Sequence, residues 1–346
     1  MRTTYPTPAP VLRQARLKLM EQGDLPDCGI SQGLILSWRR SAAAGLAPDS
    51  RIGAGEHASG QALHRALARN HELISHSRPV MEYLFEQVRR SDSMVILADN
   101  RGVLMHTLGA PDFVGKAERV ALMPGACWSE EHRGTNAIGV ALAETGDVEI
   151  HGAEHFLERN GFLTCAASAI VSATGELLGI LDISGDQRSR HPHTLGLVNT
   201  AAQMIENRLA VAAFRRHLRL HFHGTPEGIG TVAEGIVALS EDGWIVGANR
   251  NALRLLGLRV ADIGATPLFR ILDARLEGIV AQARRQPQQP FLLQRHDGKT
   301  LYATLHGDAP AATVRPPAPE TPRDDALARL DTGDAAWQRA ADKARR

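Results

Sequence analysis

Residues 124–139 of this 346-residue chain read PGACWSEEHRGTNAIG and concentrate side chains that can recognise a ligand. Acidic, imidazole and guanidinium groups follow one another from Glu130 to Arg133, and a core strand could not bury them together without partners. Gly125 and Gly134 permit the positive φ angles of tight turns. The run therefore predicts the wall of a recognition site.

A helix is expected directly after this run and should end near Gly146. Thr135 or Asn136 can cap its first turn. Free backbone amides and the positive end of the helix dipole could there hold a carboxylate, a phosphate or a polar ligand. The alternative is that Thr135 and Asn136 are only caps, that residues 130–133 form a solvated loop, and that Trp128 covers the core.

Histidine and cysteine offer two further kinds of chemistry. His151 and His155 stand four apart around Glu154, as in a helical metal site, but Gly152 favours a surface turn. Cys165 could serve as a nucleophile or a redox sensor. Its apolar neighbours on an expected strand instead favour a small buried hydrophobic residue. Neither pattern predicts an enzyme, a metal site or a cofactor.

Composition limits the class of protein. The length predicts about two domains, and 43% hydrophobic residues allow real cores. With 39 Lys and Arg against 38 Asp and Glu, no global field attracts nucleic acid or a membrane. Three cysteines without C-x-x-C spacing argue against a disulfide framework. Without a signal peptide or an apolar run of about 20 residues, the chain is expected to be soluble and cytoplasmic.

Hydrophobic spacing predicts the elements that position these residues. Helices are expected over residues 11–22 and 31–44, and over 59–91 with a break at Pro79. Hairpins follow at 94–108 and 164–184. Two hairpins with helices around them predict an α+β domain with an antiparallel sheet.

A helical seam is expected after His193 and should continue as far as Phe222. Its short a/d pattern predicts a parallel homodimer, and the alternative is that the seam docks on the sheet of its own domain. The seam residues are Leu195, Val198, Ala202, Ile205, Leu209 and Ala212.

A smaller α+β domain is expected next. It begins with a hairpin at 235–248 and a helix at 249–256 that Gly257 ends, and a second hairpin spans 291–306. Five prolines between 309 and 323 predict a stiff linker.

Longer strings carry a family resemblance. Three strings resemble the GAF sensory domain of sigma-54-dependent activators, a group typified by the acetoin-catabolism regulator. The strings are LMPGACWSEEHRGTNAIGVALAETGDVEIHGAEHFL, TCAASAIVSATGELLGILDISGD and RHPHTLGLVNTAAQMIENRL. SWRRSAAAGLAPD at 37–49 is similar to the N-terminal signature of the same family. AEGIVALSEDGWIVGANRNALRLLGL resembles the first hairpin and helix of a PAS domain. A second likeness is the glycerol-metabolism regulator, which combines GAF and PAS sensing under the control of kinase subunits.

The resemblance implies a sensor followed by an AAA+ ATPase and a DNA-binding helix-turn-helix. A Walker A loop is missing from this sequence, because the nearest match, Gly298-Lys299-Thr300, has Leu293 where the first glycine belongs. Contacts with DNA and sigma-54 polymerase are therefore expected only through domains absent from residues 1–346. Such a chain would be a sensory fragment, a truncated product or a stand-alone regulator. The implied divisions are an N-terminal helical region (1–75), a GAF-like domain (76–206), a connecting signalling helix (207–225), a PAS-like domain (226–308), the Pro-rich linker (309–323) and a lead-in to the ATPase (324–346).

The expected function is signal sensing without catalysis. A small-molecule effector would bind the GAF-like domain, and the connecting helix would pass the signal on. The alternative is a protein-interaction module that a regulatory partner controls without any small ligand. The expected ligand contacts are Trp128 as an apolar lid, Thr135 and Asn136 as polar orienters, and His155 and Cys165 as further wall residues.

Overall fold

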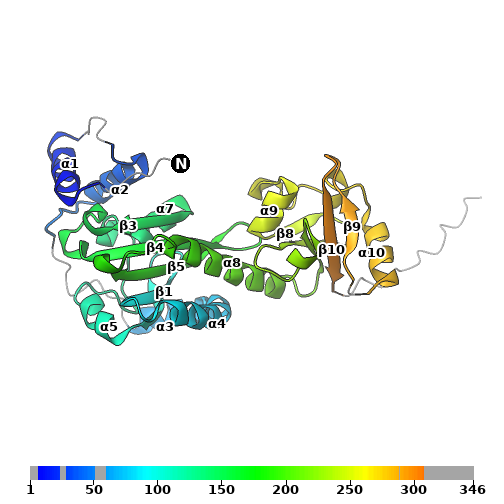
Figure 1. The fold of residues 1–346 in the computed structure, drawn as a ribbon, viewed down its shortest axis with the longest axis horizontal. Coiled ribbons are helices and arrows are strands. Elements are labelled where there is room, and N and C mark those ends of the chain that lie inside the picture. The colour runs from blue at the N-terminus through cyan, green and yellow to red at the C-terminus, as the bar shows by residue number, and fades with distance from the viewer. Residues whose placement is uncertain (1–6, 24–28, 51–59, 288, 308–346) are drawn as a thin grey trace, which may run out of the picture. The chain divides into compact units, whose positions relative to one another are not determined.

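Two antiparallel sheets of five strands each organise the chain in the computed structural model (Figure 1). The structure describes residues 7–23, 29–50, 60–287 and 289–307, so the expected linker at 309–323 and the lead-in at 324–346 lie outside it. The first sheet has the strand order β2-β1-β5-β4-β3. Its strands are β1 (Ser93–Asp99), β2 (Leu104–Gly109), β3 (Asp147–His151), β4 (Leu163–Val171) and β5 (Leu177–Asp186).

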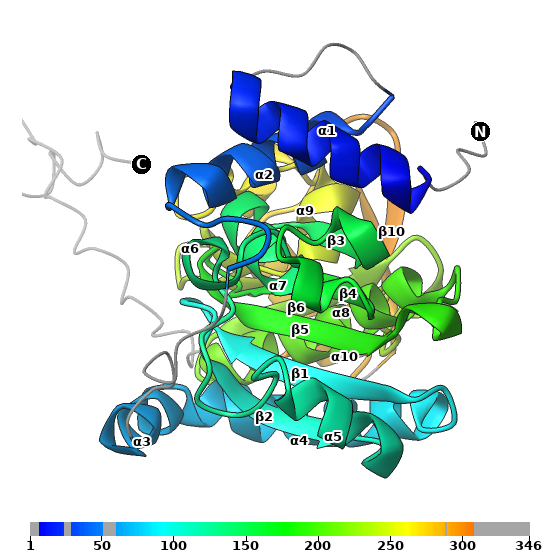
Figure 2. The ribbon, with the colours of Figure 1, turned by 90° about the vertical axis from the view of Figure 1, so that its left-hand side faces the viewer.

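Helices cover both faces of the first sheet, with α1, α2 and α7 above it and α4 below it in Figure 2. The α+β class and the two hairpins expected from the sequence are thus confirmed. The helices are α1 (Ala9–Gln22), α2 (Gln32–Ala43), α3 (Gly60–Arg69), α4 (His71–Val88), α5 (Pro111–Glu118), α6 (Glu130–Arg133), α7 (Ala137–Glu144) and α8 (Thr194–Ala213), with 3-10 turns η1 (Gly152–Glu154), η2 (Glu158–Asn160) and η3 (Gln187–Ser189).

Strand β1 shows how the sequence builds two cores from one sheet. Successive side chains of a strand point to opposite faces. Met94 and Ile96 join the core beneath α1, α2 and α7, whereas Val95 and Leu97 join the core against α4 and α8. All four side chains are buried, and burial of each stabilises the fold by about 1.5–3 kcal/mol.

The apolar seam of α8 packs within its own domain. Val198, Ala202, Ile205 and Leu209 are buried in the core that α8 shares with α4 and the sheet. The seam is therefore occupied within one chain, which is the alternative to dimerisation that the short pattern had left open. A homodimer remains a prediction.

Helix α4 corrects one boundary expected from the sequence. It runs through Pro79, and the division from α3 falls at Asn70 instead. Proline lacks an N–H and disfavours a helix interior. Here Pro79 is exposed, while Val80 and Met81 beside it are buried. Tertiary packing of this face outweighs the cost of the proline.

The connecting helix is also shorter than expected. Helix α8 ends at Ala213, and Leu218–His223 forms β6 of the second sheet instead of continuing the helix. Leu218, Leu220 and Phe222 are buried and alternate with half-buried polar residues. This period of two is that of a strand with one face on a core.

The second sheet has the order β8-β7-β6-β10-β9 and confirms the two hairpins expected after residue 235. Asn249 caps the first helix of this domain by accepting a hydrogen bond from the Ala252 amide at 2.8 Å. The elements are β7 (Gly235–Leu239), β8 (Ile245–Ala248), α9 (Arg250–Leu256), α10 (Leu276–Arg285), β9 (Phe291–Gln294) and β10 (Thr300–His306), with turns η4 (Pro226–Gly228), η5 (Val260–Asp262) and η6 (Leu268–Arg270).

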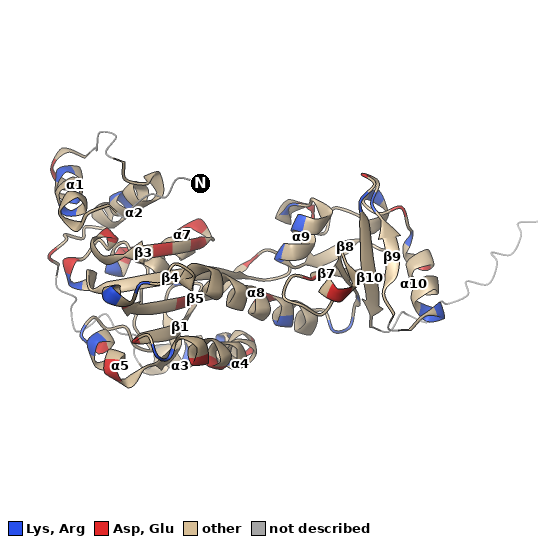
Figure 3. Cartoon of the chain, in the orientation of Figure 1, with Lys and Arg blue, Asp and Glu red and all other residues tan. Residues whose placement is uncertain are grey.

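Charged residues of both signs are interspersed in the described part of the chain. Helices α5 and α10, for example, each carry acidic and basic residues (Figure 3). Among the described residues, no helix is both long and apolar enough to span a bilayer.

Candidate functional site

The loop between α6 and α7 is held by bonds from its own residues. Asn136 caps α7 by accepting from the Gly139 amide at 2.9 Å, and its side-chain amide donates to the Trp128 carbonyl at 3.0 Å. Trp128 is buried, and its indole N–H donates to the Ala121 carbonyl at 3.0 Å. The polar atoms of Asn136 and Trp128 thus already have protein partners.

Thr135 joins this loop to helix α2. Its hydroxyl lies 2.6 Å from the Ser37 hydroxyl and 3.2 Å from that of Ser41. Ser37 also donates to the Glu130 carboxylate, which forms an ion pair with Arg40. Two segments that lie about ninety residues apart in the sequence therefore form one buried polar network. The segment around Ser37 resembles a family signature, but no local sequence signal predicts its contact with the loop.

Gly134 explains the close approach of the next loop. Its φ of 62° lies in the left-handed region, and a Cβ there would lie 2.7 Å from Cβ of Phe156. The Phe156 amide donates to the Thr135 carbonyl at 3.2 Å. This contact brings the loop that carries His155 against the loop that carries Thr135.

His155 and Cys165 meet in the core of the first domain. Nδ1 of His155 lies 3.0 Å from the Gly152 carbonyl, which can only accept, so Nδ1 carries the proton. Nε2 is then an acceptor, and the Cys165 thiol lies 3.6 Å from it. Burial lowers the pKa of His155 to about 4. The imidazole is therefore neutral near pH 7.

Two strand residues that the sequence reasoning missed complete this cluster. The Ser184 hydroxyl lies 3.1 Å from Sγ of Cys165 and 2.6 Å from Oδ2 of Asp182. Asp182 is fully buried on the central strand β5, between Ile96 of β1 and Ala167 of β4. Burial raises the pKa of Asp182 to about 7. Its other oxygen, Oδ1, is buried without a hydrogen-bond partner.

This arrangement is unsuited to nucleophilic catalysis. Burial, followed by the nearby Asp182 carboxylate, raises the pKa of the Cys165 thiol. The reactive form of cysteine is the thiolate, which a raised pKa disfavours. The cluster of His155, Cys165, Asp182 and Ser184 can instead offer hydrogen-bond donors and acceptors to a small polar group.

A buried arginine holds the loop that carries His155. Arg16 of α1 is 2% exposed and donates through Nη1 to the carbonyls of His155, at 2.6 Å, and Ala153, at 3.1 Å. Burial lowers the pKa of Arg16, and Glu158 opposes the shift. Nothing in the sequence marked Arg16, because the carbonyls that it binds lie more than a hundred residues away.

A solvent-accessible groove of about 1030 Å³ is lined in part by other residues of the run 124–139. Within it, Nδ1 of His132 lies 2.8 Å from the Ser129 hydroxyl and 3.7 Å from Sγ of Cys127. None of the five expected contact residues lines the groove. Its lining comprises Arg40, Ala43, Ala44, Asn100, Arg101, Val103, Cys127, Ser129, Glu130, Glu131, His132, Gly139, Leu142 and Ala143.

Curated proteins similar to this chain include transcriptional activators and regulatory proteins. The acetoin catabolism regulatory protein of Cupriavidus necator is 33% identical over 272 residues, which cover 76% of this chain and 41% of that protein. The activator AcoR of the acetoin dehydrogenase operon of Bacillus subtilis is 29% identical over 203 residues, or 59% of this chain and 33% of that protein. The chain thus spans well under half the length of either relative. Its class is the regulatory sensory region of transcriptional activators, which is regulatory and not enzymatic.

The family follows from a match over the first part of the chain. Residues 7–207 match the family described as MimR, N-terminal domain, and this range is more than half of the chain. The protein belongs to this family.

A solved structure supports the fold. The structure of the Escherichia coli DhaR(N)-DhaL complex matches with a TM-score of 0.52 at 14% identity, covering 80% of this chain and all of the matched one. At that identity the likeness concerns the fold alone. The match extends beyond residue 207, where the family match ends.

Proposed function

We propose that this chain is the cytoplasmic, dimeric sensory region of a bacterial transcriptional regulator. The first domain is a GAF-like fold that binds a small-molecule effector, the second is PAS-like, and helix α8 passes the signal between them. Contacts with DNA and sigma-54 polymerase belong to domains that residues 1–346 do not contain.

The observation that carries the proposal is the unpaired oxygen of Asp182. A buried polar atom without a partner costs about 1–3 kcal/mol, and Oδ1 of Asp182 is such an atom at the centre of an apolar sheet. A hydroxyl group of an effector would donate to Oδ1 and remove this cost. An anionic effector is disfavoured, because it would bury a second negative charge beside this carboxyl group.

The expected contact residues then take different roles. His155 and Cys165 contact the effector together with Asp182, because all three lie in one cluster. Trp128, Thr135 and Asn136 shape the surrounding wall. We assign the apolar surface of the site to Trp128, and the positions of the two loops to Thr135 and Asn136, whose polar atoms bond within the protein.

The loop between β3 and β4 gives access to the cluster in this proposal. It contains the short turns η1 and η2 and is held by Arg16. The residues on this side of the sheet, including Ala98, Ala167 and Ala169, are small, and we therefore propose an effector of only a few carbon atoms. The relatives named for acetoin suggest a small neutral hydroxyketone as the first probe.

Calorimetric titration and thermal shift with acetoin test the proposal, with lactate as an anionic probe of similar size. We expect acetoin to bind and to raise the melting temperature, and lactate to do neither. Asp182→Ala should abolish binding, whereas the control Asp186→Asn should keep it, because Asp186 lies at the end of the same strand and pairs with Lys116. The response to acetoin should be the same in Asp186→Asn as in the wild type.

Two results would count against the assignment. Loss of acetoin binding in His132→Ala but not in Asp182→Ala would place the effector in the groove. If none of acetoin, 2-butanone, 2-propanol and 1,2-propanediol binds, the proposal of a small neutral effector is wrong.

A second candidate function is control by a protein partner. The matched region of DhaR was solved as a complex with DhaL, and the second domain of this chain exposes large apolar side chains. Trp244 is 41% exposed and Phe269 is 54% exposed, close to the bridge between Trp244 and Pro267. Retention of a partner by the wild type but not by Trp244→Ser/Phe269→Ser would support this function. Equal retention by both would oppose it.

A further inference from the structure

Four successive residues at the start of α9 bond to elements of the first domain. Residues 248–251 end strand β8 and begin the helix. The bonds run from the Ala248 amide to the Ala173 carbonyl (2.8 Å), from Nδ2 of Asn249 to Oδ1 of Asn207 (2.7 Å), from Nη2 of Arg250 to Oε1 of Glu206 (2.7 Å) and to the Ala169 carbonyl (3.0 Å), and from Nδ2 of Asn251 to Oε1 of Gln203 (3.4 Å).

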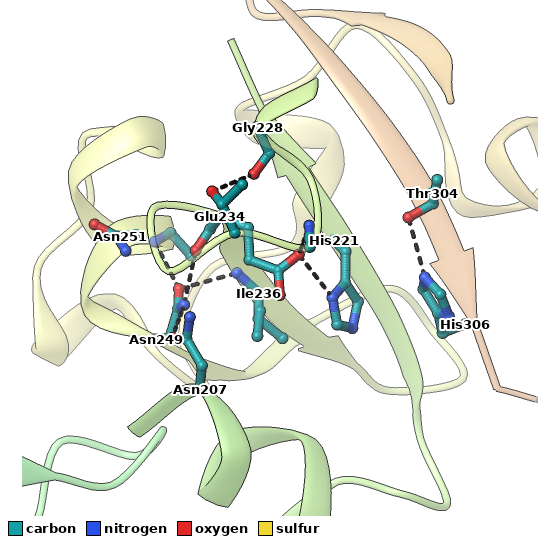
Figure 4. A network of polar contacts seen from close by, with 12 residues as sticks. Asn207, His221, Gly228, Glu234, Ile236, Asn249, Asn251, Thr304 and His306 are labelled. Carbon is teal, nitrogen blue, oxygen red and sulfur yellow. Dashed lines mark hydrogen bonds and ion pairs between the residues drawn. The ribbon is translucent and has the colours of Figure 1, made fainter. Parts of the chain in front are cut away.

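Helix α8 supplies three of these partners from one face. Gln203, Glu206 and Asn207 stand three and four residues apart, the spacing of neighbours on a helix surface. Asn207 also donates through Nδ2 to the Val232 carbonyl at 3.2 Å. Figure 4 shows Asn207 reaching from α8 towards Asn249. The side chain of Asn207 thus bonds the second domain twice.

Arg250 is the counter-charge of a buried carboxylate. Glu206 is 3% exposed, and its Oε1 also accepts from the Val171 amide at 2.9 Å. Burial raises the pKa of Glu206, and the positive charge of Arg250 opposes this shift. Removing one partner of a buried ion pair leaves an uncompensated charge, which is strongly destabilising. The pair therefore links strand β4, helix α8 and helix α9.

The β4–β5 turn approaches the second domain at a glycine, which faces the side chain of Val260. Gly175 has φ +89°, and a Cβ placed there would lie 2.1 Å from Cγ1 of Val260 in η5. Only glycine permits this approach of the backbone. Both sheets lie within one compact unit that ends at Gly307.

We propose that residues 248–251 form an interdomain clamp that makes the two sheet domains one cooperative folding unit. The clamp conveys displacements of the β4–β5 hairpin directly to the second sheet, in addition to the covalent path from α8 into β6. The clamp involves the described residues alone and does not require an effector, so the proposed function and the clamp can be tested independently.

Hydrogen–deuterium exchange and calorimetry on the whole chain test the clamp. We expect wild-type residues 60–307 to unfold in one transition. Arg250→Met should split this transition in two and speed amide exchange in α9 and at the end of β4 by about tenfold or more. The matched control is Arg259→Met, because Arg259 is 86% exposed on the same domain and pairs locally with Asp262. Its exchange and its single transition should be unchanged.

Two further variants keep the test decisive if Arg250→Met does not fold. Glu206→Gln/Arg250→Met removes both charges and leaves no buried ion unpaired, and Asn207→Ala removes two bonds without changing charge. Faster exchange at both ends of the interface in these variants supports the clamp. Two separate transitions in the wild type, or unchanged exchange in all three variants, would overturn it.

Discussion

The hydroxyl of Ser37 on α2 lies 2.6 Å from the hydroxyl of Thr135, 98 residues further along the chain. Ser37 also bonds Glu130, so one small side chain connects helix α2 both to α6 and to the loop that follows it. Both serine and threonine are fully buried. The N-terminal helices are therefore part of the first domain's core and its polar interior.

Loss of this contact should destabilise the protein measurably. Ser37→Ala leaves Glu130 and Thr135 buried with one partner fewer, and we expect the free energy of unfolding to fall by about 1–3 kcal/mol. Urea denaturation followed by circular dichroism measures the change. Thr200→Ala on α8 is the control, since Thr200 is exposed and bonds only within its own helix in this structure. A decrease no larger than that of Thr200→Ala would show that the network does not stabilise the fold.

The pH dependence of stability should reveal two opposed groups in the buried cluster. Burial raises the pKa of Asp182 from 3.8 to about 7, so the folded state holds this proton more tightly than the unfolded state. Its contribution to stability is present at low pH and is lost as pH rises through about 7. Burial lowers the pKa of His155 from 6.5 to about 4. Its contribution is present above pH 6.5 and is lost as pH falls towards 4.

These dependences should offset each other in the wild type between about pH 4 and 6.5. Asp182→Asn removes the pH-dependent contribution of Asp182 to the free energy of unfolding, which is up to about 4 kcal/mol. The stability of this variant relative to the wild type should therefore increase as pH rises. His155→Gln should show the reverse slope. Denaturant titrations at several pH values measure both differences. Parallel pH profiles for the wild type and both variants would contradict the assigned protonation states.

Gly134 offers a test of the close approach between the two site loops. Alanine there meets both an unfavourable positive φ and the Cβ of Phe156. Gly29 has φ +71° with no atom within 4 Å, so Gly29→Ala isolates the backbone cost of about 1–2 kcal/mol. Gly134→Ala should cost about 1–3 kcal/mol more than this. Equal losses in chemical denaturation would mean that Phe156 moves aside freely.

Pro79 should be a site of stabilisation. Alanine would supply the N–H that proline lacks within α4, and Pro79 is exposed, so no core contact is lost. We expect Pro79→Ala to raise the free energy of unfolding by about 1–2 kcal/mol, after allowance for the greater freedom of the unfolded chain. Differential scanning calorimetry gives the result, with Arg78→Ala as the neighbouring exposed control. A lower melting temperature would indicate that α4 needs the proline for its path.

Local sequence signals predicted the hairpins because turn residues act over a few positions. Gly102 and Gly175 adopt the positive φ angles that their turns require. Strand β6 was missed because Arg215 and Arg216 beside it resembled a continuing charged helix face, although Leu218, Leu220 and Phe222 alternate as a strand does. Its assignment depends on pairing with distant strands.

The candidate site was only partly predictable for a similar reason. His155 and Cys165 were identified from their types, and the structure brings them together. Asp182 and Ser184 stand two apart on an apolar strand, a pattern that places both on one face. That pattern could have marked them as a pair, but no local signal shows that an oxygen of Asp182 has no partner. The carbonyls that Arg16 binds lie far along the chain, so no local signal predicts these hydrogen bonds.

Strand β4 carries the cluster near its first residue and the contact with Glu206 at its last. Cys165 and Val171 are separated by about 20 Å at the usual rise of a strand, and the ladder to β5 is regular from Cys165 to Ile170, with a register shift between Ile170 and Val171. A strand bonded in this way is stiff along its axis. If an effector shifts Cys165 by a fraction of an ångström, the Val171 amide should shift by nearly the same amount. The signal would then reach the second domain without a large rearrangement of the first.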